Sequence, residues 1–151
     1  MKHLLITLGD PYGIGPEITF KALKNLGQTK ADITVIGDIA AFKSLGTLKQ
    51  NINYIDIKSR YGAPKKAEPS KRGGDISFKA LNTAIKLALK IKNASLITAP
   101  ISKEAWQKAG IKYMGYTEVL RQKAADKVSP SRVELWAERT GPGAGGTQPA
   151  V

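Results

Sequence analysis

Three short segments of this 151-residue chain carry polar or charged side chains that could contact a ligand, and two of the three also contain glycines. The first segment covers residues 9–17, GDPYGIGPE, and follows an apolar run. Glycines let the backbone turn sharply and approach a ligand closely, so Asp10, Gly13 and Gly15 form a candidate ligand-facing loop. A tight structural turn is the competing interpretation, because the spacing is not GxGxxG and Glu17 would repel an anion.

The second segment covers residues 97–104, ITAPISKE, where an apolar run leads into a helix-like segment. Ligands of open α/β sheets bind beyond the carboxyl ends of the strands, and there Lys103 could meet a phosphate as a point charge. The alternative is purely structural: Ser102 caps the helix and Lys103 is solvated. Taken alone, this spacing favours the structural interpretation.

The third segment covers residues 109–120, AGIKYMGYTEVL. We expect Gly110 to end one helix and Thr117 to be the N-cap of the next. A hydroxyl beside a flexible glycine can also hold a phosphate oxygen or a substrate hydroxyl. Spacing alone favours capping over binding.

The elements that must position these segments alternate along the chain. Short apolar runs predict strands at residues 4–8, 33–36, 52–57 and 96–99, and helical periodicity predicts helices at about 16–26, 39–45, 77–92, 101–109 and 117–127. Strands that alternate with helices indicate βαβ units, and therefore an α/β fold with a mostly parallel sheet and flanking helices. Residues 59–74, rich in Lys, Pro and Gly, are predicted to be a long surface loop.

Charge and composition limit the classes of function. The net charge of +12 is compatible with an anionic ligand, a polyanion or a solvated lysine coat. In the predicted helix 77–92, the lysines Lys79, Lys86 and Lys90 form one stripe. The opposite face should meet the core and consists of Ser77, Leu81, Ala84, Ile85 and Ala88. The helix is therefore an ordinary amphipathic one.

The chain has no cysteine and one histidine, His3, which excludes disulfides, thiolate metal sites and a multi-histidine metal site built from this sequence. No apolar run approaches the ~18–20 residues of a membrane span, and the apolar start is too short for a signal peptide. We therefore expect a soluble cytoplasmic protein that does not bind membranes.

The composition changes after residue 128. Residues 129–151 contain no Lys and no Ile, and carry several prolines and glycines. Such a segment cannot bury much apolar surface, so residues 1–128 are predicted to be the folded part and 129–151 a flexible tail of foreign character.

The three segments, in this order, resemble the 4-hydroxythreonine-4-phosphate dehydrogenase family of vitamin B6 biosynthesis. The family motif G-D-P-x-G-I-G-P-E is matched at residues 9–17, I-T-A-P-I-x-K-E at 97–104, and A-G-I-x-x-x-G-H-T-E at 109–118 except at one position. The resemblance covers about residues 1–125. It implies a fold similar to isocitrate and isopropylmalate dehydrogenases, of which this chain would form an incomplete, N-terminal part.

The resemblance also implies an activity. Family members use NAD and a divalent metal (Zn, Mg or Co) to oxidise, with decarboxylation, 4-phosphohydroxy-L-threonine, and they act as homodimers. Relatives oxidise other phosphorylated hydroxy acids, such as 4-phosphothreonate or 4-phosphoerythronate. The family's substrate-binding histidine and threonine correspond to Tyr116 and Thr117 here, and tyrosine carries no positive charge near neutral pH.

The family's metal ligands and most of its cofactor contacts follow the third motif, and none is recognisable in residues 129–151. We therefore expect this chain to be inactive by itself and to bind neither NAD nor the metal. A basic nucleic-acid-binding domain is the alternative suggested by the charge. The scattered lysines and the lack of a nucleic-acid motif argue against it.

Overall fold

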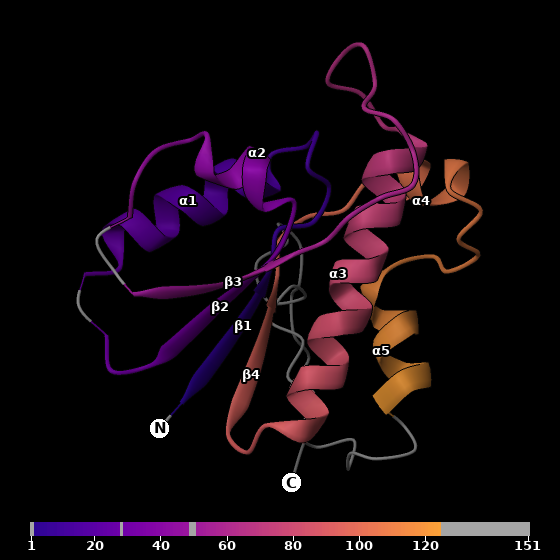
Figure 1. The fold of residues 1–151 in the computed structure, drawn as a ribbon. Helices are drawn as coiled ribbons and strands as arrows, with labels where there is room; N and C mark the ends of the chain where they lie inside the picture. The colour runs from indigo at the N-terminus through magenta and orange to yellow at the C-terminus, as the bar shows by residue number, and fades with distance from the viewer. Residues whose placement is uncertain (1, 28, 49–50, 125–151) are drawn as a thin grey trace, which may run out of the picture.

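The apolar runs form four strands that pair in parallel. The computed structural model describes residues 2–27, 29–48 and 51–124, and the sheet has the order β3-β2-β1-β4 (Figure 1). The strands are β1 (His3–Thr7), β2 (Asp32–Gly37), β3 (Ile52–Asp56) and β4 (Ala94–Thr98). The prediction of a parallel α/β sheet is confirmed, and each strand lies within two residues of its expected bounds.

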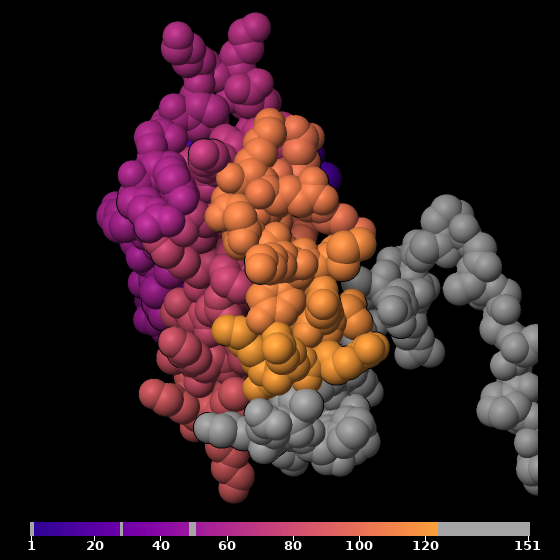
Figure 2. Space-filling model, turned by 90° about the vertical axis from the view of Figure 1, so that its right-hand side faces the viewer, coloured from indigo at the N-terminus to yellow at the C-terminus, as the bar shows by residue number. Residues whose placement is uncertain are grey.

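Helices cover both faces of the sheet. α1 (Gly15–Asn25) and α2 (Ile39–Lys43) lie on one face, and α3 (Lys71–Lys90) lies on the other (Figure 1). Phe20 of α1 and Phe42 of α2 share a buried cluster with Ile6 and Val35, whereas Ala80 and Ala84 of α3 pack against the opposite face. α4 (Lys103–Lys108) and α5 (Tyr116–Ala124) lie over α3, as the orange segment in Figure 2 shows.

The helix α3 begins at Lys71 rather than near residue 77, so the prediction of a surface loop through residue 74 is wrong at its end. The Ser70 hydroxyl caps this helix by accepting a hydrogen bond from the Gly73 N–H at 3.1 Å. Glycines weaken the helical signal, but two are needed here for packing. A Cβ at Gly74 would lie 2.1 Å from the Ala105 carbonyl oxygen, so Gly74 allows α4 to approach α3.

The amphipathic pattern predicted for this helix is confirmed. Ser77, Leu81, Ala84 and Ile85 are buried, Ala88 is partly buried, and the predicted lysine stripe is exposed. The Ser77 hydroxyl accepts a hydrogen bond from Trp106 Nε1 at 2.9 Å and donates one to the Gly74 carbonyl. Ser77 thus joins α3 to α4 in the core.

Two of the predicted helix ends can be compared directly. Gly110 follows α4 with φ of 78° and donates its N–H to the Gln107 carbonyl, as expected of a glycine at a helix C-terminus. Thr117 is not an N-cap, because α5 already begins at Tyr116.

None of the helices among the described residues is long and apolar enough to cross a membrane. The predicted tail at 129–151 lies outside the described residues.

The strand order identifies one special place in the sheet. The chain moves outward from β1 to β2 and β3, and α3 then brings it back to β4 on the other side of β1. The order therefore reverses between β1 and β4. Open α/β sheets bind ligands beyond the carboxyl ends of the strands at such a switch point.

Candidate functional site at the carboxyl ends of β1 and β4

The first two sequence segments meet at this switch point. The Ala99 N–H donates to the Thr7 carbonyl at 2.9 Å, and the Asp10 N–H donates to the Pro100 carbonyl at 3.1 Å. Gly9 has φ of 69°, and a Cβ there would lie 2.0 Å from the Pro100 carbonyl oxygen. A glycine is therefore required where the loop after β1 touches the turn after β4.

Asp10 lies inside this contact rather than on its surface. Its residue is 3% exposed, and its Oδ1 accepts a hydrogen bond from the Tyr12 N–H at 3.0 Å. Burial raises the pKa of the Asp10 carboxyl, and the Tyr12 hydrogen bond opposes that rise. A Cβ at Gly73 would lie 2.4 Å from Asp10 Oδ1, so the carboxyl packs directly on the first turn of α3.

The two glycines predicted for the ligand loop have different surroundings. Gly15 is buried, and a Cβ there would lie 2.1 Å from the Leu8 carbonyl oxygen. Gly13 is exposed and donates its N–H to the Asp10 carbonyl at 3.0 Å. The structural-turn interpretation therefore accounts for Asp10 and Gly15, whereas Gly13 and the adjacent Ile14 are exposed to solvent.

The turn after β4 ends at a capped helix. The Ser102 hydroxyl accepts a hydrogen bond from the Ala105 N–H at 3.1 Å, as the sequence predicts. Lys103 is the first residue of α4 and is exposed. Glu104 is paired with Lys108 at 2.9 Å, which reduces the negative charge near the lysine.

Tyr116 and Thr117 face different surroundings. The Tyr116 hydroxyl donates to the Ala99 carbonyl, and its ring packs edge-on against Trp106, with 6.0 Å between the ring centroids. Burial raises the pKa of the Tyr116 phenol far above its ordinary value. Thr117 lies in the first turn of α5 and is exposed. The structure thus brings Asp10 and Tyr116 together at the strand ends and leaves Thr117 at the surface.

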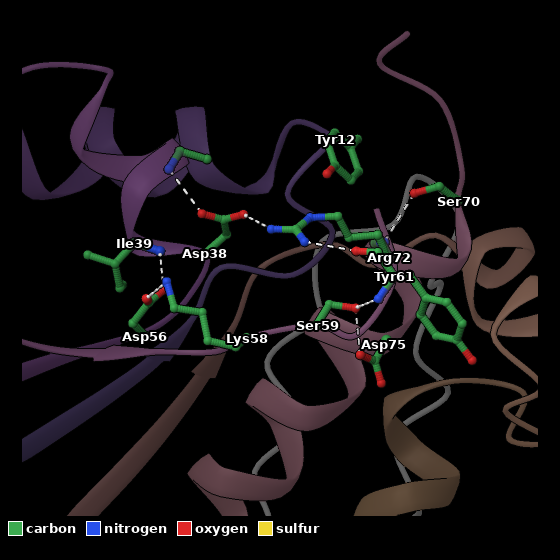
Figure 3. Close-up of polar contacts among 12 residues, drawn as sticks. Tyr12, Asp38, Ile39, Asp56, Lys58, Ser59, Tyr61, Ser70, Arg72 and Asp75 are labelled. Carbon is green, nitrogen blue, oxygen red and sulfur yellow. Dashed lines mark hydrogen bonds and ion pairs between the residues drawn. The ribbon is translucent and has the colours of Figure 1, made fainter. Parts of the chain in front are cut away.

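Sequence reasoning missed an arginine at the neighbouring strand ends. Arg72 lies 3.5 Å from Asp38 and donates to the Tyr61 carbonyl at 3.0 Å, with Tyr12 above it (Figure 3). Burial raises the pKa of the Tyr12 phenol, and the nearby positive charge of Arg72 only partly opposes that rise. The only signal was an aspartate, Asp38, two residues after a predicted strand, and Arg72 itself lay in the stretch assigned to a loop.

This arrangement bears on nucleotide binding. In dinucleotide-binding folds, an acidic residue after the second strand holds the ribose hydroxyls. Asp38 occupies that place, but its Oδ1 accepts from the Ala41 N–H at 3.1 Å and its Oδ2 faces Arg72. The first loop also lacks the GxGxxG spacing. These residues therefore do not fit NAD at this end of the sheet.

The described residues do not fit a divalent metal either. Within residues 2–27, 29–48 and 51–124, no group of three or more His, Cys, Asp or Glu side chains could hold an ion. No step of a reaction is therefore assigned to a metal held by these residues.

Comparison with known proteins finds one family model and relatives that are dehydrogenases of phosphorylated substrates. The family model described as pyridoxal phosphate biosynthetic protein PdxA matches residues 11–135. A 4-hydroxythreonine-4-phosphate dehydrogenase of Synechococcus sp. (strain JA-3-3Ab) is 40% identical over 136 residues, which are 81% of this chain and 39% of the relative. D-threonate 4-phosphate dehydrogenase of Salmonella typhimurium is 34% identical over 79% of this chain and 43% of its own length.

A solved structure gives the same result. The crystal structure of 4-hydroxythreonine-4-phosphate dehydrogenase from Klebsiella pneumoniae superposes with a TM-score of 0.71 and 29% identity, covering 83% of this chain and 45% of that one. The chain thus spans less than half the length of the relatives it matches. With the parallel sheet, the two strand-end loops and a family-model match over most of its length, the chain belongs to the PdxA family.

Proposed function

We propose that this chain is the part of a PdxA-type dehydrogenase that supplies one wall of the substrate site. The whole protein would oxidise 4-phosphohydroxy-L-threonine with NAD, and the 3-keto acid formed would then lose carbon dioxide. The observation that carries the proposal is the meeting of the family's first two motifs at the switch point, through the Asp10–Pro100 and Ala99–Thr7 hydrogen bonds.

The exposed side chains at this place suit a phosphorylated substrate. Lys103 offers a positive charge on the first turn of α4, and a lysine binds phosphate as a point charge. Thr117 offers a hydroxyl on the first turn of α5. The nearby Glu118 carboxylate accepts a hydrogen bond from the Met114 N–H at 2.7 Å, so its charge is directed toward the backbone.

Other phosphorylated hydroxy acids are the second candidate substrates. The match to a D-threonate 4-phosphate dehydrogenase favours this alternative. Both candidate substrates carry a phosphate and a hydroxy acid, so both use the same lysine and hydroxyl. NAD, a divalent metal and a homodimeric assembly belong to the proposal for the whole protein, as does a cytoplasmic location.

The test is a binding titration followed by a turnover assay. Amide NMR signals of residues 102–104 and 117 are followed while 4-phosphohydroxy-L-threonine or D-threonate 4-phosphate is added. The proposal expects saturable shifts that weaken at least tenfold in Lys103→Met and stay unchanged in the control Lys24→Met, an exposed lysine in the last turn of α1.

Turnover is then measured as NADH formation with NAD and Mg²⁺ or Zn²⁺, with the chain alone and with the remaining part of the Synechococcus relative added as a separate polypeptide. Metal-dependent turnover that requires the added polypeptide supports the proposal, and the preferred substrate decides between the two candidates. Turnover by the chain alone would contradict the proposal that it supplies only one wall of the site. No shift at these residues with either substrate would refute the proposed site.

A further inference from the structure

The Tyr116 side chain reaches from α5 to the end of β4. Its hydroxyl donates to the Ala99 carbonyl, and its ring is held edge-on by Trp106, which is fully buried. The ring contact and the hydrogen bond together orient the side chain toward the end of β4. Tyr116 therefore ties α5 to the switch point.

The hydroxyl of Tyr116 is surrounded by polar groups of the two strand ends. Thr7 is the last residue of β1 and is fully buried, and its Oγ1 has no hydrogen-bond partner among the described residues. Burial raises the pKa of the Tyr116 phenol, and the Thr7 hydroxyl partly opposes that rise. The carboxyl of Asp10 is close enough to affect the ionisation of the phenol. A phenol has one proton to donate, and here it is donated to the protein.

The Ala99 carbonyl belongs to the turn that carries the ligand-facing lysine. Ala99 itself is bound to Thr7 through its N–H, Pro100 accepts from Asp10, and the chain then enters α4 at Lys103. A group that fixes the Ala99 carbonyl also fixes the path of this turn. The hydrogen bond from the Tyr116 hydroxyl therefore restrains the backbone that determines the position of Lys103.

We propose that Tyr116 is a positioning residue of the switch-point site: its hydrogen bond to the Ala99 carbonyl holds the turn of residues 99–103 against the loop after β1, and the phenol does not bind the substrate. This inference rests on the proposed function for the place of the substrate. It gives the tyrosine a role directed into the protein, and it leaves substrate contacts to Lys103 and Thr117.

The test compares the Tyr116→Phe variant with the unmodified chain. Phenylalanine keeps the ring packed on Trp106 and removes only the hydroxyl. Tyr113→Phe is the matched control, because the Tyr113 hydroxyl donates to the Gln122 side chain at 2.5 Å and is exposed. The measurements are amide hydrogen exchange at Asp10 and Ala99, and a titration with inorganic phosphate followed at the Lys103 amide.

We expect exchange at Asp10 and Ala99 to become about fivefold faster in Tyr116→Phe, since one net hydrogen bond is lost. Exchange at Gly73, which Ser70 caps, should not change. Phosphate binding at Lys103 should weaken several-fold, while the ring signals of Tyr116 in the unmodified chain should not move as phosphate is added. Tyr113→Phe should alter none of these quantities.

Two results would overturn the inference. One is a Tyr116 ring signal that shifts with phosphate and saturates together with Lys103, because the phenol would then contact the ligand. The other is unchanged exchange at Asp10 and Ala99 in Tyr116→Phe. If phosphate fails to bind at Lys103 in the unmodified chain, the proposed function fails, and the exchange data still decide whether Tyr116 holds the turn.

Discussion

The contact between the two strand-end loops depends on Gly9, and replacing it with alanine is the sharpest test of that geometry. Gly9 has φ of 69°, and a Cβ there would lie 2.0 Å from the Pro100 carbonyl oxygen and 2.8 Å from the Ala99 carbonyl oxygen. Both neighbours are backbone atoms, so neither can rotate away. The loop and the turn would have to separate.

The cost has two sources. Placing alanine in the left-handed region costs about 1–2 kcal/mol, and forcing extra volume into a packed contact costs about 1–3 kcal/mol. We therefore expect Gly9→Ala to lower the free energy of unfolding by about 3 kcal/mol. For a chain of this size, a loss of that order lowers the melting temperature by roughly 6–12 °C.

Gly13→Ala is the matched control within the same loop. A Cβ at Gly13 would lie 3.5 Å from the Asp10 carbonyl oxygen, an ordinary contact, and its φ needs no glycine. Both variants are compared by thermal and urea unfolding, followed by circular dichroism. If Gly9→Ala and Gly13→Ala differ by less than about 0.5 kcal/mol, which is the usual size of surface effects, the two loops do not meet as described.

Three further predictions concern the groups around the site. Ser77→Ala leaves the buried Trp106 N–H without its acceptor, so urea unfolding should show a loss of about 1–3 kcal/mol. Burial raises the pKa of the Asp10 carboxyl in the folded state, so just above the ordinary pKa the folded chain binds more protons than the unfolded chain. The free energy of unfolding should therefore fall as the pH rises through that window. Asp10→Asn should remove this contribution to the pH dependence, as measured by unfolding from pH 4 to 7. Arg72→Met breaks the bond to the Tyr61 carbonyl, so limited proteolysis should cut the segment between β3 and α3 several-fold faster, and cleavage at the unmodified rate would show that Arg72 does not hold it.

The sequence predicted the sheet well because its signal is local. The run at residues 33–36 places apolar side chains on both faces, with Ile33 and Val35 in one buried cluster and Ile36 in the other, as expected for a strand of a parallel sheet covered on both faces. The helix ends at Ser102 and Gly110 were also predictable, because capping depends on one side chain or one backbone conformation. These elements needed no knowledge of the tertiary structure.

The start of α3 could not be predicted in the same way. Gly73 and Gly74 lower the helical signal, and the reason for both glycines is tertiary: Asp10 packs on the first and the Ala105 carbonyl on the second. The direction of the Tyr116 hydroxyl also depends on the tertiary structure, because its partner Ala99 lies in the turn after β4. The spacing of residues in the sequence therefore could not show which atoms Gly73, Gly74 and Tyr116 contact.

The geometry of the switch point also limits where a substrate can lie. Between β1 and β4, the space is closed by the Gly9–Pro100 contact and by the Tyr116 hydroxyl on the Ala99 carbonyl. The proposed substrate site therefore lies outside this contact, and the two residues proposed to bind the substrate, Lys103 and Thr117, are exposed in the first turns of α4 and α5. A positive charge and a hydroxyl on two helix starts suit a phosphate ester better than an apolar ligand. This is the chemistry that the proposed substrates share.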